Sequence, residues 1–204
     1  MSTPTRTSVN GCGAVSAMAN SLTAVPDIPS TDVCLLRRGN TNCGGCGMSI
    51  GLTMLGRALA EAEETCTLSI PACCGIVAAG AFPTTSYAVP TVATTFAAAA
   101  AVGSGLAAVR ELNRESHHVV CFAGDGGTYD IGLATISAAA ERNDDLLYIC
   151  YDNEIYGNTG GQRSSATPPG ARTTTTPHGK VEAKKDIVAI LAAHRIPYAA
   201  TLSI

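Results

Sequence analysis

Two apolar runs, each followed by a polar cluster, give the clearest structural signal in this chain. Residues 119–123 are apolar and lead into Gly124-Asp125-Gly126-Gly127, and residues 146–151 are apolar and lead into Asp152-Asn153. Between them, residues 128–142 carry apolar side chains at helical spacing. This order predicts a strand, a tight turn, a helix and a second strand, which is the βαβ unit of a parallel sheet. Both polar clusters should then lie at the carboxyl ends of strands, where open α/β sheets bind ligands.

The pattern on either side extends this unit. Residues 48–61 are apolar at positions 50, 52, 54, 55, 58 and 59, as in a helix packed on a core, and residues 65–71 are strand-like. Residues 96–109 predict an Ala- and Gly-rich helix, residues 182–194 an amphipathic helix, and residues 197–204 the start of another strand. We therefore expect an α/β fold in which helices cover both faces of a parallel sheet.

Length and composition fit one such domain. The chain has 204 residues, of which 46% are hydrophobic, so it can bury a substantial core. Residues 1–30, rich in Ser, Thr, Ala and Pro, predict a flexible arm, and residues 31–204 predict the domain, which we expect to lack a C-terminal portion. A net charge of −3 gives no reason to expect nucleic acid as a partner. The uncharged stretch 65–109 is interrupted by prolines, which argues for burial in the protein and against a membrane span.

The glycines and the aspartate of the first polar cluster suggest a specific chemistry. Gly124, Gly126 and Gly127 let the backbone approach a phosphate and supply amide donors at a helix start. Asp125 would repel a bare phosphate, but a divalent cation between the two removes the conflict. With the Asn153 oxygen and a nearby carbonyl, the shell would contain only oxygen, which suits Mg²⁺. The alternative is an ordinary strand-to-helix turn with Asn153 as a helix cap. A nicotinamide-binding domain is disfavoured because no Gly-x-Gly-x-x-Gly follows a strand.

The nine cysteines include two close groups, Cys43-Gly44-Gly45-Cys46 and Cys73-Cys74. This grouping in a chain of this size favours metal ligands in a reducing cytoplasm over a secreted disulfide scaffold. A Cys-x-x-Cys ahead of a helix has three common interpretations, a redox dithiol, half of a zinc site or part of an iron–sulfur site. The spacing alone leaves all three open.

Two motifs together resemble a known family. Gly124-Asp125-Gly126, followed at the usual interval by Asn153, resembles the thiamine diphosphate signature, and residues 152–168 resemble the β subunit of pyruvate:ferredoxin oxidoreductase, a 2-oxoacid:ferredoxin oxidoreductase. The resemblance implies the diphosphate-binding type of thiamine diphosphate fold. It also implies that Asp125, Asn153 and the carbonyl of Ile155 bind Mg²⁺, and that Asn158 is a catalytic residue near the reactive thiazolium carbon.

The same resemblance implies an iron–sulfur role for three cysteines. Cys43, Cys46 and Cys74 would bind a [4Fe-4S] cluster, and Cys74 would also approach the thiamine. Cys73 stands where the family usually has Gly, so the assignment between Cys73 and Cys74 stays open. The family's fourth ligand lies beyond the last cysteine of this chain, Cys150, and is absent. Possible substitutes, each more often structural, are Cys12, Cys34 and Cys66.

The implied activity is thiamine-dependent oxidative decarboxylation of pyruvate, with coenzyme A as co-substrate and electrons passed through the cluster to ferredoxin. Oxidoreductases for 2-oxoisovalerate and oxalate look alike at this level. The partners implied are an α subunit that binds the aminopyrimidine and supplies the activating glutamate, and cluster-bearing γ and δ subunits. Residues 159–180 would form an ordered loop near the active site and pack against a partner. Two rival interpretations are a cluster-free thiamine decarboxylase or carboligase, and a zinc-stabilised α/β binding module.

Overall fold

Helical segments and strands alternate from residue 47 to residue 151 in a computed structural model, which describes residues 35–80 and 84–203. The arm predicted at residues 1–30 lies outside these ranges, as do Cys12 and Cys34. The elements are α2 (Gly47–Glu61), β1 (Cys66–Pro71), α3 (Cys74–Ala78), β2 (Thr91–Thr94), α4 (Ala99–Asn113), β3 (His118–Gly124), the π-helix η1 (Gly126–Asp130), α5 (Leu133–Arg142), β4 (Leu147–Tyr151), β5 (Ile155–Tyr156), β6 (Gln162–Arg163) and α6 (Ile187–Ala192).

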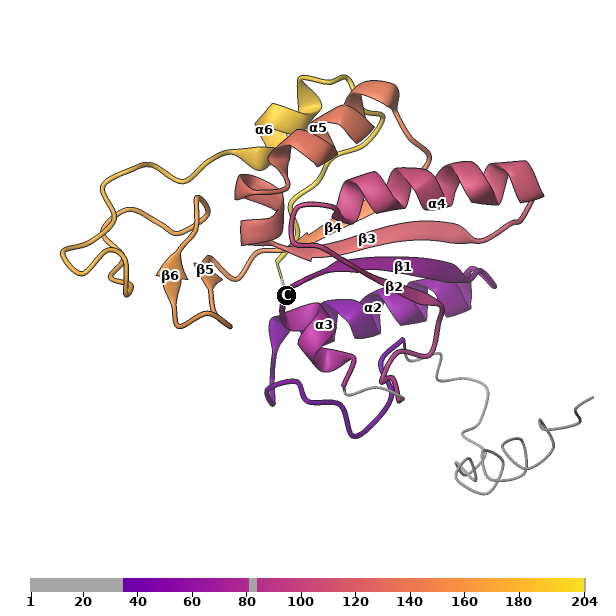
Figure 1. The fold of residues 1–204 in the computed structure, drawn as a ribbon, viewed down its shortest axis with the longest axis horizontal. Helices are drawn as coiled ribbons and strands as arrows, with labels where there is room; N and C mark the ends of the chain where they lie inside the picture. Colours follow the sequence, from indigo (N-terminus) through magenta and orange to yellow (C-terminus); the bar gives the residue numbers. More distant parts are fainter. Residues whose placement is uncertain (1–34, 81–83, 204) are drawn as a thin grey trace, which may run out of the picture. The chain divides into compact units, whose positions relative to one another are not determined.

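The central sheet is parallel and runs in the order β2-β1-β3-β4 (Figure 1). Its register places Cys66 opposite His118 and Gly124 opposite Tyr151, so the apolar runs of the sequence become adjacent strands. The chain adds β2 on one side of β1 and then crosses back to add β3 on the other. The strand order therefore reverses between β1 and β3, and ligands of open α/β sheets bind outside the carboxyl ends at such a point.

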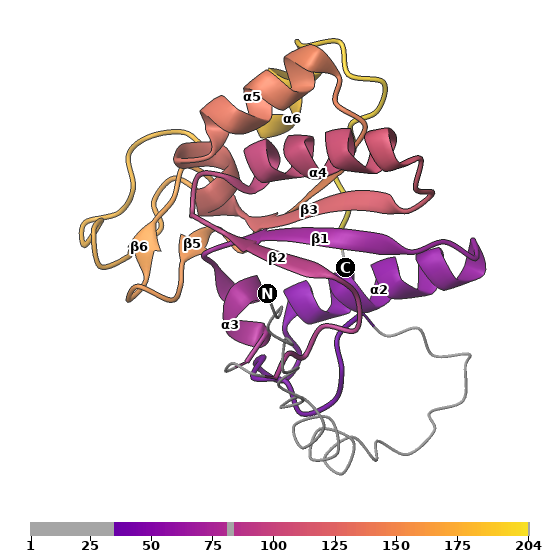
Figure 2. The same cartoon turned by 45° about the vertical axis from the view of Figure 1, so that its right-hand side comes forward.

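Helices cover both faces of the sheet, as the sequence predicted. Helices α2 and α3 lie on one face, and α4 and α5 lie on the other (Figures 1 and 2). Leu52 of α2 packs with strand residues such as Leu68 and Phe122 in the larger core, while Ala100 of α4 packs with Ile136 of α5 in a second cluster. Within residues 35–80 and 84–203, every helix is too short or too polar to cross a membrane.

Helix α4 approaches the sheet closely because its inner face carries small residues. A side-chain carbon added at Gly103 would lie 2.2 Å from the Cys121 sulfur of β3. At the first turn of α4, Ser69 Oγ donates a hydrogen bond of 2.9 Å to the Ala99 carbonyl, which further ties the helix to β1. The Ala- and Gly-rich composition of α4 thus permits backbone-to-sheet contact.

This contact makes α4 a matched test of packing. Gly103→Ala should lower the free energy of unfolding by about 1–3 kcal/mol, because the methyl group overpacks a buried contact. Gly105→Ala, two residues on, meets nothing within 4 Å and should stabilise the helix by about 0.5–1 kcal/mol. Urea unfolding of both variants measures the difference, and equal effects would show that α4 does not depend on Gly103.

Three predicted elements differ in extent from the structure. The helix expected at residues 128–142 is divided into η1 and α5. At the junction a side-chain carbon at Gly132 would lie 1.9 Å from the Gly127 carbonyl oxygen, so the backbone there requires glycine. The helix expected at 182–194 is shortened to α6, since Lys185 N–H donates to the Ser165 carbonyl across the chain. The strand expected from residue 197 is wrong for residues 197–203, where no ladder partner is present and Pro197 lacks a donor.

Candidate functional site

Three adjacent strands bring the predicted site residues to one end of the sheet. Strand β1 leads into Cys73-Cys74-Gly75, β3 leads into Gly124-Asp125-Gly126-Gly127, and β4 leads into Asp152-Asn153. Because β1 and β3 flank the point where the strand order reverses, these segments surround the position at which α/β sheets hold ligands. The turn after β3 continues directly into the π-helix η1, and π-helical turns are frequent at functional sites.

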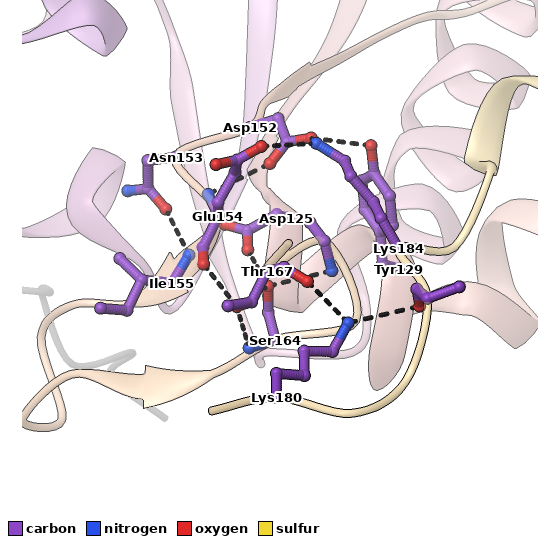
Figure 3. Close-up of polar contacts among 12 residues, drawn as sticks. Asp125, Tyr129, Asp152, Asn153, Glu154, Ile155, Ser164, Thr167, Lys180 and Lys184 are labelled. Atoms are coloured by element: carbon purple, nitrogen blue, oxygen red, sulfur yellow. Dashed lines mark hydrogen bonds and ion pairs between the residues drawn. The ribbon is translucent and has the colours of Figure 1, made fainter. Parts of the chain in front are cut away.

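Asp125 is a buried carboxylate with a fixed orientation. Its side chain is held by the hydroxyl of Ser164, which donates to Oδ2, and the residue is only 2% exposed (Figure 3). Burial raises the pKa of Asp125 to about 6; the nearby Asp152 carboxylate adds to the increase, and the Ser164 hydrogen bond opposes it. A carboxylate kept out of water in this way favours a positively charged partner.

Asn153 faces Asp125 and the Ile155 carbonyl at short range. One terminal atom of its amide lies 2.8 Å from Asp125 Oδ1 and 2.9 Å from the Ile155 oxygen. With the amide nitrogen on this side, Asn153 donates to both oxygens; a half-turn of the amide places three oxygens together. Oxygens at adjacent corners of an octahedral Mg²⁺ site lie about 2.9 Å apart, given bonds of about 2.0–2.1 Å. The donor set and its spacing therefore fit Mg²⁺.

The turn that presents the Ile155 carbonyl is fixed by polar contacts. Glu154 has a positive φ of 62°, which is uncommon for a residue with a side chain, and its N–H donates to Asp152 Oδ1 at 3.1 Å. Lys184 bridges the two carboxylates, 2.8 Å from Asp152 and 2.9 Å from Glu154 (Figure 3). Thr167 Oγ1 donates to the Glu154 carbonyl at 2.5 Å. These contacts determine where the Ile155 carbonyl points.

Gly126 allows the turn after β3 to lie against an aromatic ring. A side-chain carbon at Gly126 would come within 2.2 Å of Tyr156 Cε1. The ring is held in place because Tyr156 Oη donates to Asp130 Oδ2 at 2.7 Å, and Phe96 packs edge-on with a centroid distance of 5.9 Å. The second glycine of the signature is therefore needed for close approach of Tyr156.

Asn158 and Cys74 meet at the same end of the sheet. The Asn158 amide nitrogen donates to the Cys74 sulfur at 3.4 Å, although the two residues are 84 positions apart in the sequence. Cys73 is directed elsewhere, since its thiol donates to the Pro71 carbonyl at 2.9 Å. Of the two cysteines between which the sequence left the assignment open, Cys74 is the one that contacts Asn158.

Comparison with known proteins identifies the family to which this site belongs. The family described as "Thiamine pyrophosphate enzyme, C-terminal TPP binding domain" matches residues 72–203, which include all three strand ends described above. The chain belongs to the thiamine pyrophosphate enzymes. Thiamine pyrophosphate is the same compound as thiamine diphosphate, so the match agrees with the signature at Asp125 and Asn153.

Subunits of pyruvate synthase and of ketoisovalerate oxidoreductase are similar to this thiamine pyrophosphate enzyme. Pyruvate synthase subunit PorB of Methanothermobacter thermautotrophicus is 44% identical over 175 residues, which cover 83% of this chain and 60% of that protein. Ketoisovalerate oxidoreductase subunit VorB of Pyrococcus abyssi is 46% identical over 177 residues, or 81% of this chain and 56% of that protein. The chain thus spans little more than half the length of these relatives.

A solved structure shares the fold of this thiamine pyrophosphate enzyme. It is a 2-oxoglutarate:ferredoxin oxidoreductase from Magnetococcus marinus, described as having 2-oxoglutarate, coenzyme A and succinyl-CoA bound. The match has a TM-score of 0.68 at 24% identity and covers 84% of this chain and 57% of that one. The likeness confirms the predicted α/β fold.

The cysteines predicted to bind an iron–sulfur cluster do not form a complete metal site in the described part of this thiamine pyrophosphate enzyme. Cys43 is exposed, and Cys46 is half-buried immediately before α2; both are free thiols, as is Cys74. Among residues 35–80 and 84–203, no three His, Cys, Asp or Glu side chains are placed to hold one metal ion. Cys66 and Cys150 lie in strands, and burial raises the pKa of their thiols to about 11 and about 12.

The individual roles of Ser164, Thr167 and Lys180 in this thiamine pyrophosphate enzyme were missed by the sequence analysis. All three are buried and connect the loop after β6 to Asp125 and Glu154. The spacing of Ser164 and Thr167 is typical of a side-chain-stabilised turn, which is a signal for local structure. Nothing in the local pattern indicates the distant carboxylate that this turn contacts.

Proposed function

We propose that the chain binds thiamine diphosphate through Mg²⁺ and acts as the β subunit of a 2-oxoacid:ferredoxin oxidoreductase, with pyruvate as the 2-oxoacid. The observation that carries this proposal is the convergence of Asp125, Asn153 and the Ile155 carbonyl at the point where the strand order reverses. The names of the relatives, pyruvate synthase and ketoisovalerate oxidoreductase subunits, support the reaction class. A zinc-stabilised binding module would have no use for this oxygen set.

The chain's own residues would position the cofactor and the substrate. Asp125, Asn153 and Ile155 would hold Mg²⁺, and the turn from Gly124 to Gly127 would hold the diphosphate. When bound, thiamine diphosphate supplies the electron sink for decarboxylation of a 2-oxoacid. Asn158 is proposed as the catalytic polar group near that centre, and its amide nitrogen donates to the Cys74 sulfur at 3.4 Å. Burial of Asp125 keeps water from competing for the cation.

The cluster and the partners complete the proposal. Cys43, Cys46 and Cys74 are proposed as [4Fe-4S] ligands, with the fourth ligand outside this chain. In the described residues these cysteines do not form a three-ligand group. An α subunit would supply the glutamate for the aminopyrimidine, γ and δ subunits would carry further clusters, and coenzyme A and ferredoxin would accept the acyl group and the electrons.

Cofactor analysis of the anaerobically purified complex tests the proposed function. With the full-length protein and its partner subunits, we expect one thiamine diphosphate per chain, about four iron atoms for each bound cluster, and a visible absorbance that bleaches with pyruvate and coenzyme A. Pyruvate should give a higher kcat/KM than 2-oxoisovalerate. Thiamine without cluster iron on this subunit would identify a cluster-free decarboxylase, and zinc without thiamine would contradict both enzyme functions.

A further inference from the structure

The Ser164 hydroxyl donates its hydrogen bond to the carboxylate of Asp125. The serine is fully buried, and its only hydroxyl proton is donated to Asp125 Oδ2 (Figure 3). The Ser164 hydroxyl oxygen also accepts a hydrogen bond of 3.1 Å from the Ala166 N–H, which fixes the direction in which the hydroxyl points. A carboxylate with one oxygen bonded in this way presents only its other oxygen, Oδ1, to Asn153 and to a cation.

Thr167 holds Ser164 in place and reaches the opposite side of the same site. The Ser164 N–H donates to Thr167 Oγ1 at 2.9 Å, and the Thr167 N–H donates back to the Ser164 carbonyl at 3.2 Å. Thr167 Oγ1 in turn donates to the Glu154 carbonyl, next to the Ile155 ligand. One tight turn therefore contacts Asp125 directly and contacts the peptide segment that presents the Ile155 carbonyl.

Lys180 is a buried lysine, which is uncommon, and it is hydrogen-bonded to this turn. The residue is 3% exposed, and its ammonium donates to the Thr167 carbonyl at 2.6 Å and to the Ala183 carbonyl at 3.3 Å. Within residues 35–80 and 84–203, the Lys180 ammonium contacts these carbonyl oxygens, and no carboxylate lies within ion-pair distance of it. Burying an ammonium is costly unless it is hydrogen-bonded. The bonds to the Thr167 and Ala183 carbonyls offset this cost and hold the lysine against the turn.

We propose that Ser164, held by Thr167 and Lys180, is a positioning residue that makes Asp125 a one-oxygen ligand of the cation. The inference rests on the proposed Mg²⁺ and thiamine diphosphate site, and it assigns the loop after β6 a role within this chain. Loss of a partner that orients a metal ligand typically lowers the affinity for the metal by about 10- to 100-fold. The turn is thus part of the cation site without touching the cation.

Neighbouring serines provide a matched test. The Ser165 hydroxyl also donates to a carboxylate, but to Asp130, which is not among the proposed ligands. With thiamine diphosphate present, Ser164→Ala should weaken Mn²⁺ binding roughly 10- to 100-fold. Ser165→Ala should leave Mn²⁺ affinity unchanged. The complex is first stripped of its bound cation and then supplied with thiamine diphosphate, and its Mn²⁺ binding is measured by electron paramagnetic resonance. Thermal unfolding of the same samples shows whether the two variants lose similar stability.

The outcomes separate this inference from the function on which it rests. Wild-type affinity in Ser164→Ala, or an equal loss in Ser165→Ala, would show that the turn serves stability only. Thr167→Val, which preserves side-chain shape, is a second variant that should weaken Mn²⁺ binding in the same direction. A wild-type complex that binds neither Mn²⁺ nor thiamine diphosphate would overturn the proposed function itself.

Discussion

Asp125→Asn should abolish cation-dependent binding of thiamine diphosphate and at the same time stabilise the cofactor-free protein. The substitution removes the only formal charge from the three-oxygen set while it preserves the shape of the side chain. The affinity for Mg²⁺ should fall by more than the roughly 100-fold that loss of an outer hydrogen-bond partner can cause. Calorimetric titration with thiamine diphosphate at several Mg²⁺ concentrations measures the loss.

Asp125→Asn should weaken cofactor binding but stabilise the cofactor-free protein, because the charge of Asp125 is buried. Its pKa is raised from 3.8 to about 6, so the folded protein binds this proton more tightly than the unfolded chain does. Proton binding by Asp125 therefore contributes to the free energy of unfolding at low pH, and this stabilising contribution is lost as the pH rises from about 4 through 6. Above that range Asp125→Asn should raise the free energy of unfolding of the cofactor-free protein by about 1–3 kcal/mol.

A surface carboxylate provides the control for both effects. Asp145 pairs with Arg110, and its side chain is 87% exposed. Asp145→Asn should change neither cofactor binding nor the pH dependence of unfolding, because an exposed ion pair contributes little. An Asp125→Asn protein that still binds thiamine diphosphate with Mg²⁺ at wild-type affinity would contradict the assignment of Asp125 as a ligand.

Gly126→Ala should give the second-largest effect, a combined loss of stability and of cofactor binding. The added carbon would lie 2.2 Å from Tyr156 Cε1, and the ring is held by Asp130 and Phe96. Relief of this overlap must move the segment that carries the Ile155 carbonyl. We expect a loss of about 1–3 kcal/mol in the free energy of unfolding, measured with urea, together with weaker thiamine diphosphate binding.

Two further variants show whether the overlap is the cause. Gly51→Ala places the same methyl group in α2, where nothing lies within 4 Å, and should stabilise the protein by about 0.5–1 kcal/mol. Tyr156→Leu, introduced together with Gly126→Ala, removes the overlapping ring atom and should recover part of the lost stability. Wild-type stability and binding in Gly126→Ala alone would mean that Tyr156 can move freely.

The parts of the site that could be predicted from sequence are those encoded locally. Apolar runs followed by Gly124-Asp125-Gly126 and by Asn153 predict strands and their carboxyl ends, and the parallel register confirms that these ends are adjacent. The family resemblance implied the Ile155 carbonyl as a ligand, and in the structure this carbonyl lies 2.9 Å from the Asn153 amide. Its role as a Mg²⁺ ligand stays a prediction, as do those of Asp125 and Asn153.

The parts that could not be predicted depend on contacts between distant residues. Ser164 contacts Asp125 across 39 positions, and Lys180 lies in a polar stretch whose composition is typical of a surface loop. Strand β2 was missed because its four residues are at the sheet edge and alternate in no clear apolar pattern. The strand expected from residue 197 was a wrong prediction. Its residue pattern is suitable for a strand, but no neighbouring strand pairs with it in the described residues.

The position of the cation tests the central claim most directly. A structure of the complex with Mn²⁺ and thiamine diphosphate, determined with anomalous scattering from manganese, would locate the ion. We expect one peak within about 2.0–2.4 Å of Asp125 Oδ1, the Asn153 amide oxygen and the Ile155 carbonyl oxygen. A manganese peak elsewhere in the chain, or thiamine diphosphate bound without contact to these three oxygens, would contradict the account.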